Sequence, residues 1–181
     1  MSIISQPVPE SVLPEATGPD AMLVVVTSNV IAATIAAIAG IVELPVVVVD
    51  QADGPALDQL GALGLTARHA VVLTDHDAPD VAAIIRTVLD GPAGYLGMMG
   101  SRSRSAHLFE TLRAEGAEGA EGADEQALGR LHVPVGLDLG GSRTAGLIAL
   151  SVVSEVTAWA NGRLTREGDR SGLEHQGLRT P

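Results

Sequence analysis

Short runs of aliphatic residues alternate with helix-like segments along most of this chain, and this alternation limits the folds that it can adopt. The runs lie at residues 22–26, 45–49, 70–73, 95–99 and, less clearly, 133–135. They are continuously apolar, which is typical of strands buried on both faces of a parallel sheet. Aromatic residues make up only 2% of the chain, so the core of such a sheet has to consist of Val, Leu, Ile and Ala.

The segments between these runs carry helical patterns. The clearest lies at residues 79–89, where apolar side chains recur three and four positions apart. Further helices are expected at residues 30–40, 55–63, 102–114 and 144–161. Strands that alternate with helices predict right-handed crossovers, and hence a Rossmann-like α/β fold with a parallel sheet and helices on both faces. We expect the strand order 3-2-1-4-5, with a ligand crevice between the first and fourth strands.

The length of 181 residues suits one folded domain with polar ends. We expect a disordered lead-in at residues 1–20, a Rossmann-like domain at residues 21–162 and a polar tail at residues 163–181. Residues 1–10 carry no secretory signal, and polar residues interrupt the uncharged stretch at 21–42. A cytoplasmic protein with no membrane association is therefore the expectation.

Composition excludes several kinds of chemistry. The chain has no cysteine and no lysine, since all eleven basic residues are arginine. Thiolate metal sites, thiol nucleophiles, Walker-type phosphate loops and Schiff bases are thereby excluded. The net charge of −11 argues against binding to nucleic acid, whose phosphates require a basic surface.

A candidate anion-binding turn follows the fourth run. The expected strand leads into Gly100 and Ser101, and the next helix begins with Arg102 and Arg104 close together. Free amides at a helix N-terminus, a hydroxyl and a guanidinium group can together hold an oxyanion. The alternative is an ordinary helix cap with solvated arginines.

The turn after the first strand lacks the glycines of a dinucleotide site. Ser28 and Asn29 stand where a Gly-x-Gly-x-x-Gly motif would let the backbone approach a pyrophosphate, and their β-carbons oppose such an approach. Asp50 follows the second strand, at the position of a ribose ligand. NAD(P) binding therefore remains possible but is weakened by this turn.

Two further segments hold candidate ligand residues. His76 is surrounded by acidic residues after the third run and could move protons, although a polar turn without a metal is the expectation. Gly136 and Asp138 belong to a glycine-rich loop that either admits a ligand or serves turn geometry alone. Glu155 lies on the last expected helix, where it is either buried and paired or exposed.

Taken together, these segments resemble the C-terminal Rossmann domain of the XdhC/CoxI family, which are accessory proteins of xanthine dehydrogenase and related molybdenum hydroxylases. The resemblance is carried by residues 95–104 (YLGMMGSRSR), 131–140 (LHVPVGLDLG) and 148–155 (IALSVVSE). It implies a maturation protein that binds molybdenum cofactor, a pterin with a terminal phosphate, and assists its insertion into an apo molybdenum hydroxylase. It also implies a homodimer. The expected cofactor-binding residues are Ser28, Asn29, Asp50, His76, Gly100, Ser101, Arg102, Arg104, Gly136 and Asp138.

Two other functions stay open. An NAD(P)-linked oxidoreductase would bind a dinucleotide tightly. A degenerate Rossmann module would bind no small molecule and act only through protein partners. No catalytic residues are assigned under the favoured interpretation, which leans away from an enzyme.

Overall fold

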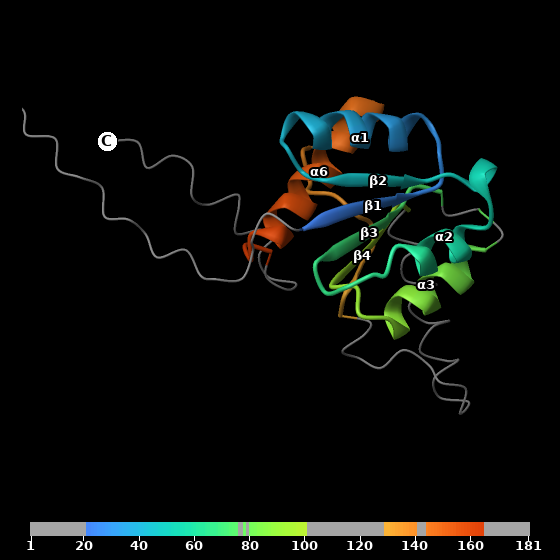
Figure 1. The fold of residues 1–181 in the computed structure, drawn as a ribbon. Helices are drawn as coiled ribbons and strands as arrows, with labels where there is room; N and C mark the ends of the chain where they lie inside the picture. The colour runs from blue at the N-terminus through green and yellow to red at the C-terminus, as the bar shows by residue number, and fades with distance from the viewer. Residues whose placement is uncertain (1–20, 76–77, 79, 101–128, 141–143, 165–181) are drawn as a thin grey trace, which may run out of the picture.

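The computed structural model describes residues 21–75, 78, 80–100, 129–140 and 144–164 (Figure 1). One parallel sheet contains the strands β1 (Met22–Val26), β2 (Val46–Val49), β3 (His69–Leu73), β4 (Tyr95–Met98) and β5 (Leu131–His132). The described helices are α1 (Val30–Ile41), α2 (Ala56–Ala62), α3 (Val81–Asp90), α6 (Ala145–Ala160) and the short 3₁₀ helix η1 (Gln51–Asp53). The prediction of a Rossmann-like α/β fold is confirmed.

The sheet is packed on both faces, as its continuous apolar strands predict. Along β1, Val24 and Val26 pack with α2 and α3, whereas Leu23 and Val25 pack with α1 and α6. All four side chains are fully buried. Burying an aliphatic side chain of this size contributes about 1.5–3 kcal/mol. Because β1 is buried on both faces, all four of these residues contribute to the stability of the fold.

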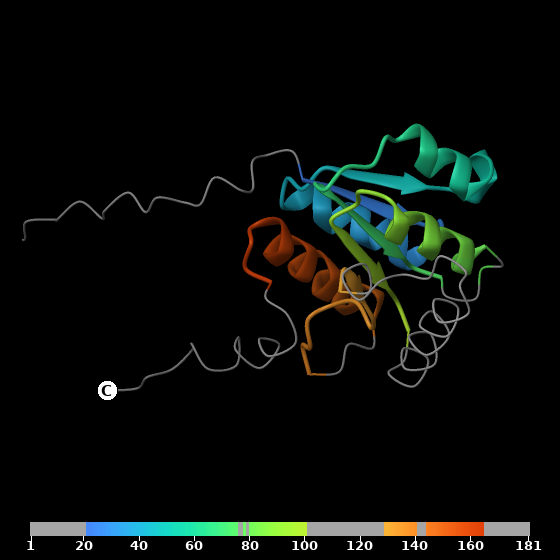
Figure 2. The same ribbon diagram turned by 90° about the horizontal axis from the view of Figure 1, so that it is seen from below.

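The helices form two layers. Figure 1 shows α1 on one side of the sheet and α2 with α3 on the other, and Figure 2 shows α2 and α3 running side by side. Helix α6 packs against α1 in the first layer. The predicted helices on both faces are therefore confirmed.

The predicted strand order was wrong. The sheet runs β2-β1-β3-β4-β5, so β1 lies between β2 and β3 rather than beside β4. The cause is the change of face between consecutive helices: α1 covers one face and α2 the other. Because both crossovers are right-handed, a helix on the opposite face carries the chain in the opposite direction. After β2, the chain therefore crosses back over β1, and β3 pairs with the other edge of β1.

This order moves the switch point of the sheet. The chain leaves β1 toward α1 on one face and leaves the neighbouring β3 toward α3 on the other. In open parallel sheets, ligands bind at the carboxyl ends of two strands that diverge in this way. The expected crevice therefore lies between β1 and β3, and not between the first and fourth strands.

Two smaller expectations also need comment. The fifth strand is Leu131–His132, two residues earlier than residues 133–135, which form the loop beyond it. The helix expected at residues 102–114 lies outside the described residues. Among the helices that the structure describes, none is long and apolar enough to cross a membrane.

Candidate functional site

Asn29 and Thr74 join the two strand ends at the switch point. The Asn29 carboxamide oxygen accepts hydrogen bonds from the amides of Ile31 (3.0 Å) and Ala32 (2.9 Å), which caps α1. Its Nδ2 donates to the carbonyl oxygen (3.4 Å) and the hydroxyl (3.2 Å) of Thr74. Both ends of the Asn29 amide are therefore engaged within the protein. Ser28 beside it is exposed, and cofactor binding by either residue stays a prediction.

The backbone of this turn is strained at Thr27. Its φ is +81°, a left-handed conformation that β-branched residues rarely adopt and that costs about 1–2 kcal/mol. The Thr27 amide donates to the carbonyl oxygen of Val49 (3.1 Å), and its own carbonyl accepts from the Thr74 hydroxyl (3.0 Å). These bonds hold a conformation for which glycine is better suited. The Thr27 side chain occupies the turn where a dinucleotide would need bare backbone.

Replacing Thr74 with valine is expected to lower the free energy of unfolding by about 2 kcal/mol, because it removes the side-chain donor of the Thr27 carbonyl oxygen, whereas the Val26 carbonyl oxygen keeps its bond from the Thr74 amide. The Thr74 hydroxyl lies 3.0 Å from the carbonyl oxygens of both Val26 and Thr27, and the side chain is 6% exposed. Urea unfolding measures the loss. Thr34→Val is the matched control, since its hydroxyl bonds only to the exposed Val30 carbonyl within α1. Equal effects of the two substitutions would contradict the assignment.

Asp50 caps the loop after β2. Its Oδ1 accepts a hydrogen bond from the amide of Ala52 (2.9 Å) and so caps η1. The Gln59 Nε2 donates to the carbonyl oxygens of Asp50 (2.7 Å) and Gly54 (2.8 Å), which fixes the loop to α2. One carboxylate oxygen of Asp50 is thus used structurally. Its role as a ribose or cofactor ligand stays a prediction.

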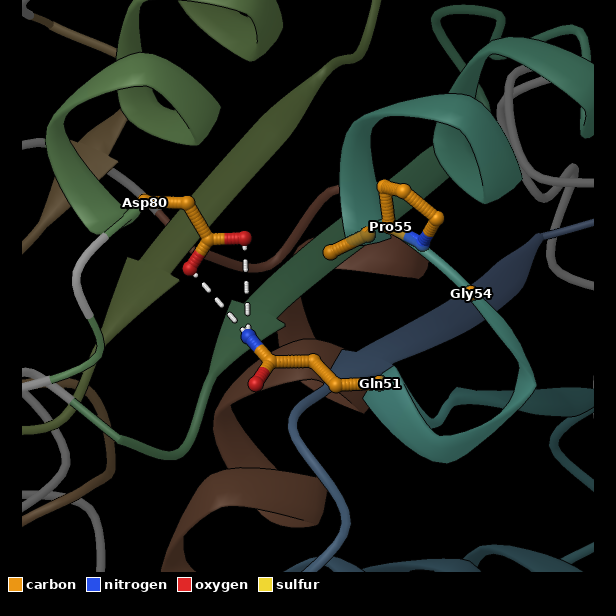
Figure 3. A pocket seen from close by; sticks show the side chains of 5 residues that line it. Gln51, Gly54, Pro55 and Asp80 are labelled. Carbon is orange, nitrogen blue, oxygen red and sulfur yellow. Dashed lines mark hydrogen bonds between the residues drawn. The ribbon is translucent and has the colours of Figure 1, made fainter.

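An open pocket of about 520 Å³ lies beside this loop, between η1, α2 and α3 (Figure 3). The residues that line it are Gln51, Gly54, Pro55, Ala56 and Asp80. The Gln51 Nε2 donates to both carboxylate oxygens of Asp80, at 3.2 and 3.4 Å. Asp80 stands at the N-cap position of α3 yet makes no capping bond there. The sequence pointed to the acidic segment around Asp80 but gave no sign of Gln51 as its partner.

Two residues close to Asp80 in the sequence belong to the same acidic segment. His76, a predicted site residue, and Asp77 are outside the described residues. Within the part of the chain that the structure describes, no three His, Asp or Glu side chains are grouped so as to hold a metal ion. The role predicted for His76 stays a prediction.

A fully buried carboxylate links α6 to strands β4 and β5 of the sheet. Glu155 in α6 is 0% exposed, and its Oε1 accepts a hydrogen bond from the Tyr95 hydroxyl (2.8 Å). The same oxygen lies 3.3 Å from Nδ1 of His132, whose ring stacks on Tyr95 with a centroid distance of 4.3 Å. Oε2 accepts a hydrogen bond from the amide of Gly136 (2.8 Å). Glu155 therefore links β4, β5 and the glycine-rich loop.

The single tryptophan of the chain lies next to the Tyr95 ring of this network. Trp159 lies one turn further along α6, with its ring centroid 5.5 Å from that of Tyr95. The sequence left open whether Glu155 is buried. Its position within the long apolar stretch of α6 was the one available signal, because the partners come from 19 to 60 residues away.

The glycines in and after β4 and in the glycine-rich loop fall into two groups. A Cβ on Gly136 would lie 2.5 Å from the Ser151 hydroxyl oxygen, and one on Gly97 would lie 2.6 Å from the Val135 side chain. These two glycines are needed for close packing within the protein. A Cβ on Gly100 would make ordinary contact, at 3.8 Å, with Met98 and Val133, the nearest described side chains. Among the described residues, nothing around Gly100 therefore requires a glycine.

The remaining predicted residues at this edge are Asp138, Ser101, Arg102 and Arg104, and the structure describes only the first of them. Asp138 Oδ1 accepts a hydrogen bond from the Gly140 amide (2.9 Å), so this side chain shapes the loop. Ser101, Arg102 and Arg104 lie outside the described residues, and their role in anion binding stays a prediction.

Comparison with known proteins agrees with this fold. The model of a family described as the XdhC Rossmann domain matches residues 23–156. Among solved structures, the chain is similar to one described as a xanthine dehydrogenase from Bacillus halodurans, with a TM-score of 0.59 and 17% sequence identity. The similarity covers 82% of this chain and 45% of that chain, so this protein spans less than half of the length of its structural neighbour. No curated protein matches. Because the family model covers most of the chain, from β1 into α6, the chain belongs to the family of the XdhC Rossmann domain.

Proposed function

We propose that this protein binds molybdenum cofactor at the carboxyl edge of its sheet and assists its insertion into a xanthine dehydrogenase or a related molybdenum hydroxylase. The observation that carries the proposal is membership of the XdhC Rossmann family over residues 23–156. The description of the structural neighbour as a xanthine dehydrogenase supports the same client class. A homodimer belongs to the proposal, as does an apo-enzyme partner.

The residues at this edge are compatible with such a ligand. No described atom lies within 4 Å of the place where a Cβ on Gly54 would be, so the backbone there can approach a bound molecule. The cofactor supplies oxidation–reduction chemistry to the enzyme that receives it. This chain then has to bind, orient and release the cofactor, and to protect it from water in the interval. The glycine-free turn at Thr27 and the structural use of Asp50 favour this role over tight NAD(P) binding.

Thermal unfolding with candidate ligands tests the proposal. Molybdenum cofactor at 100 times its dissociation constant should add about 2.7 kcal/mol to the free energy of unfolding, which raises the melting temperature by several degrees. NAD and NADP at the same concentrations should give no shift. The predicted anion-binding turn adds a variant: Arg102→Ala should weaken the cofactor effect. Light scattering on the same samples measures whether the chain forms the proposed homodimer.

Each alternative function has its own signature in this experiment. A shift with NAD alone would overturn the proposal in favour of an oxidoreductase. No shift with any small molecule would indicate a Rossmann module that acts through protein partners. A cofactor shift should be followed by transfer to apo-hydroxylase, where the loaded protein is expected to restore activity faster than free cofactor.

A further inference from the structure

We infer that the outer face of α1 is a self-association surface, on which a second copy of this chain packs its own α1 antiparallel to the first. This arrangement deepens the proposed function and rests on the homodimer that belongs to it, because it gives that homodimer a face and a geometry. Three features of α1 support it, namely the apolar side chains that it exposes, the absence of charge along it and the symmetry of its exposed residues.

Helix α1 is apolar all round, although the fold buries only one side of it. Thr34 is its one residue with a polar side chain, and the Thr34 hydroxyl donates to the Val30 carbonyl oxygen within the helix (2.7 Å). The residues that α1 buries are Ala32, Ile35 and Ala39. On its other side, Val30 is 71% exposed and Ile41 is 80% exposed. Helices that are apolar all round are ordinarily buried, so the outer face of α1 has the composition of a covered surface.

Helix α3, in the other layer, shows what an exposed helix face of this protein otherwise carries. The exposed residues of α3 are Ala82, Arg86, Thr87 and Asp90. Most of these side chains are polar or charged, as is usual for a face in contact with water. The exposed residues of α1 are Val30, Ala33, Ala37, Gly40 and Ile41. They include no polar side chain, which indicates that another apolar surface covers α1 in the assembled protein.

Charge favours a second copy of this chain as the partner. The net charge of −11 makes two copies repel one another, and contacts between acidic surfaces would add to that repulsion. Residues 21–42 contain no charged side chain, and the first acidic residue after them, Glu43, lies beyond the end of α1. Two copies can therefore approach through α1 without placing like charges in contact. A membrane surface fits less well, because interfacial helices carry Lys and Arg beside their apolar face and no basic residue precedes Arg68.

The exposed side chains of α1 are also complementary to a second copy of themselves. Each residue turns an α-helix by about 100°, which places most of the exposed residues of α1 within one sector of about 80°. The residues of this stripe are Val30, Ala33, Ala37 and Ile41. The large side chains stand at its two ends and the alanines lie between them. In an antiparallel pair about a two-fold axis, Val30 of each copy therefore meets Ile41 of the other. The alanines allow the two helix axes to approach to about 8 Å.

Helix α6 enlarges the apolar surface of the same layer. It packs against α1 and exposes Leu147 (45%) and Leu150 (44%). Figure 1 shows α1 on the side of the sheet away from α2 and α3. A stable dimer buries about 800 Å² of each partner, whereas α1, with 12 residues, is about 18 Å long and about 10 Å wide. The second copy is therefore expected to contact the exposed leucines of α6 as well as the stripe on α1.

Light scattering on the full chain tests this face. The wild type is expected to have twice the mass of the 18.5 kDa chain. Ala37→Glu places a charge in the middle of the stripe and should raise the dimer dissociation constant at least about tenfold, because each dimer contains two such charges. Ala37→Arg should do the same, and an equimolar mixture of the two variants should form dimers again. Ala82→Glu is the matched control, since it makes the same change at an exposed alanine of α3 and should leave the dimer intact.

Introduced disulfides test the direction of the two helices. The chain has no cysteine, so an introduced thiol has no native competitor. Val30→Cys mixed with Ile41→Cys should form a cross-linked dimer on oxidation. Either variant alone should not, because like positions at the ends of this antiparallel pair lie about 16 Å apart, whereas a disulfide joins Cα atoms less than about 7 Å apart.

The outcomes separate this surface from the proposed function. A dimer that survives Ala37→Glu keeps the proposed homodimer and rejects α1 as its interface. Cross-linking of Val30→Cys with itself overturns the antiparallel arrangement. A monomeric wild type overturns both the surface and the homodimer, whereas cofactor binding is measured independently by its thermal shift. A monomer that binds phosphatidylcholine vesicles, and loses this binding with Ile41→Ser, would make a membrane the partner of α1 and overturn the second copy. Circular dichroism confirms that each variant is folded.

Discussion

Replacing Glu155 with alanine is expected to lower the free energy of unfolding by about 4 kcal/mol, because the change orphans buried donors and leaves a cavity. The donors that lose their acceptor are the Tyr95 hydroxyl and the Gly136 amide, both at 2.8 Å, with Nδ1 of His132 at 3.3 Å. Glu155 is 0% exposed, so these donors have no bulk water to bond in its place. A fall in melting temperature of roughly 10 °C should accompany the loss.

Milder substitutions show how much each hydrogen-bond partner contributes to this loss of stability. Tyr95→Phe removes one donor and keeps the carboxylate, so it should cost about 1 kcal/mol. Glu155→Gln retains the shape but turns an N–H group toward one of the donors, and should fall between the other two variants. Chemical denaturation with a common slope measures all three. A Glu155→Ala variant as stable as Tyr95→Phe would mean that the carboxylate is not what joins α6 to β4 and β5.

Replacing Gly136 with alanine is expected to lower the free energy of unfolding by about 3 kcal/mol, through a collision and through backbone strain. A Cβ there would lie 2.5 Å from the Ser151 hydroxyl oxygen and 3.3 Å from the Ser151 Cβ. The residue also has a φ of +108°, which L side chains rarely adopt. Relief of the collision would move the loop away from α6 and lengthen the bond from the Gly136 amide to Glu155.

A neighbouring glycine provides the matched control. Gly140 has a φ of +81° in the same loop, but no described atom lies within 4 Å of the place where its Cβ would be. Gly140→Ala should therefore cost about 1 kcal/mol from strain alone. Adding Ser151→Ala to Gly136→Ala should recover part of the loss, because it removes the shortest contact, that to the Ser151 hydroxyl oxygen. Equal costs at the two glycines, or no recovery in the double variant, would contradict the assigned collision.

The fold class could be predicted from the sequence, but the strand order could not. Continuous valine-rich runs identify buried parallel strands, because each residue in them packs against one of two helical layers. The order depends on which face α2 covers. Helix α2 has only seven residues, two of them buried, and both faces of the sheet are apolar. Nothing local in its sequence shows that it lies opposite α1.

The candidate site was predictable only in part, for a related reason. From the sequence, the loop of Gly136 and Asp138 either admits a ligand or serves turn geometry alone, and the structure shows Gly136 packed against Ser151 and Asp138 bonded to Gly140. A glycine required by a helix and a glycine required by a ligand look the same in a sequence. Gln51 was missed because only the tertiary fold brings it to Asp80, which lies 29 residues away.

The contact between Tyr95 and Trp159 makes the protein its own optical reporter. The chain contains one tyrosine and one tryptophan, and their ring centroids are 5.5 Å apart. Light absorbed by the phenol at this separation is passed efficiently to the indole. The phenol hydroxyl is bonded to Glu155, which in turn holds the loop at Gly136. Without any added label, the protein thus contains one donor and one acceptor of excitation energy. Energy transfer from Tyr95 to Trp159 therefore reports changes at the junction between the sheet, the loop and α6 in real time.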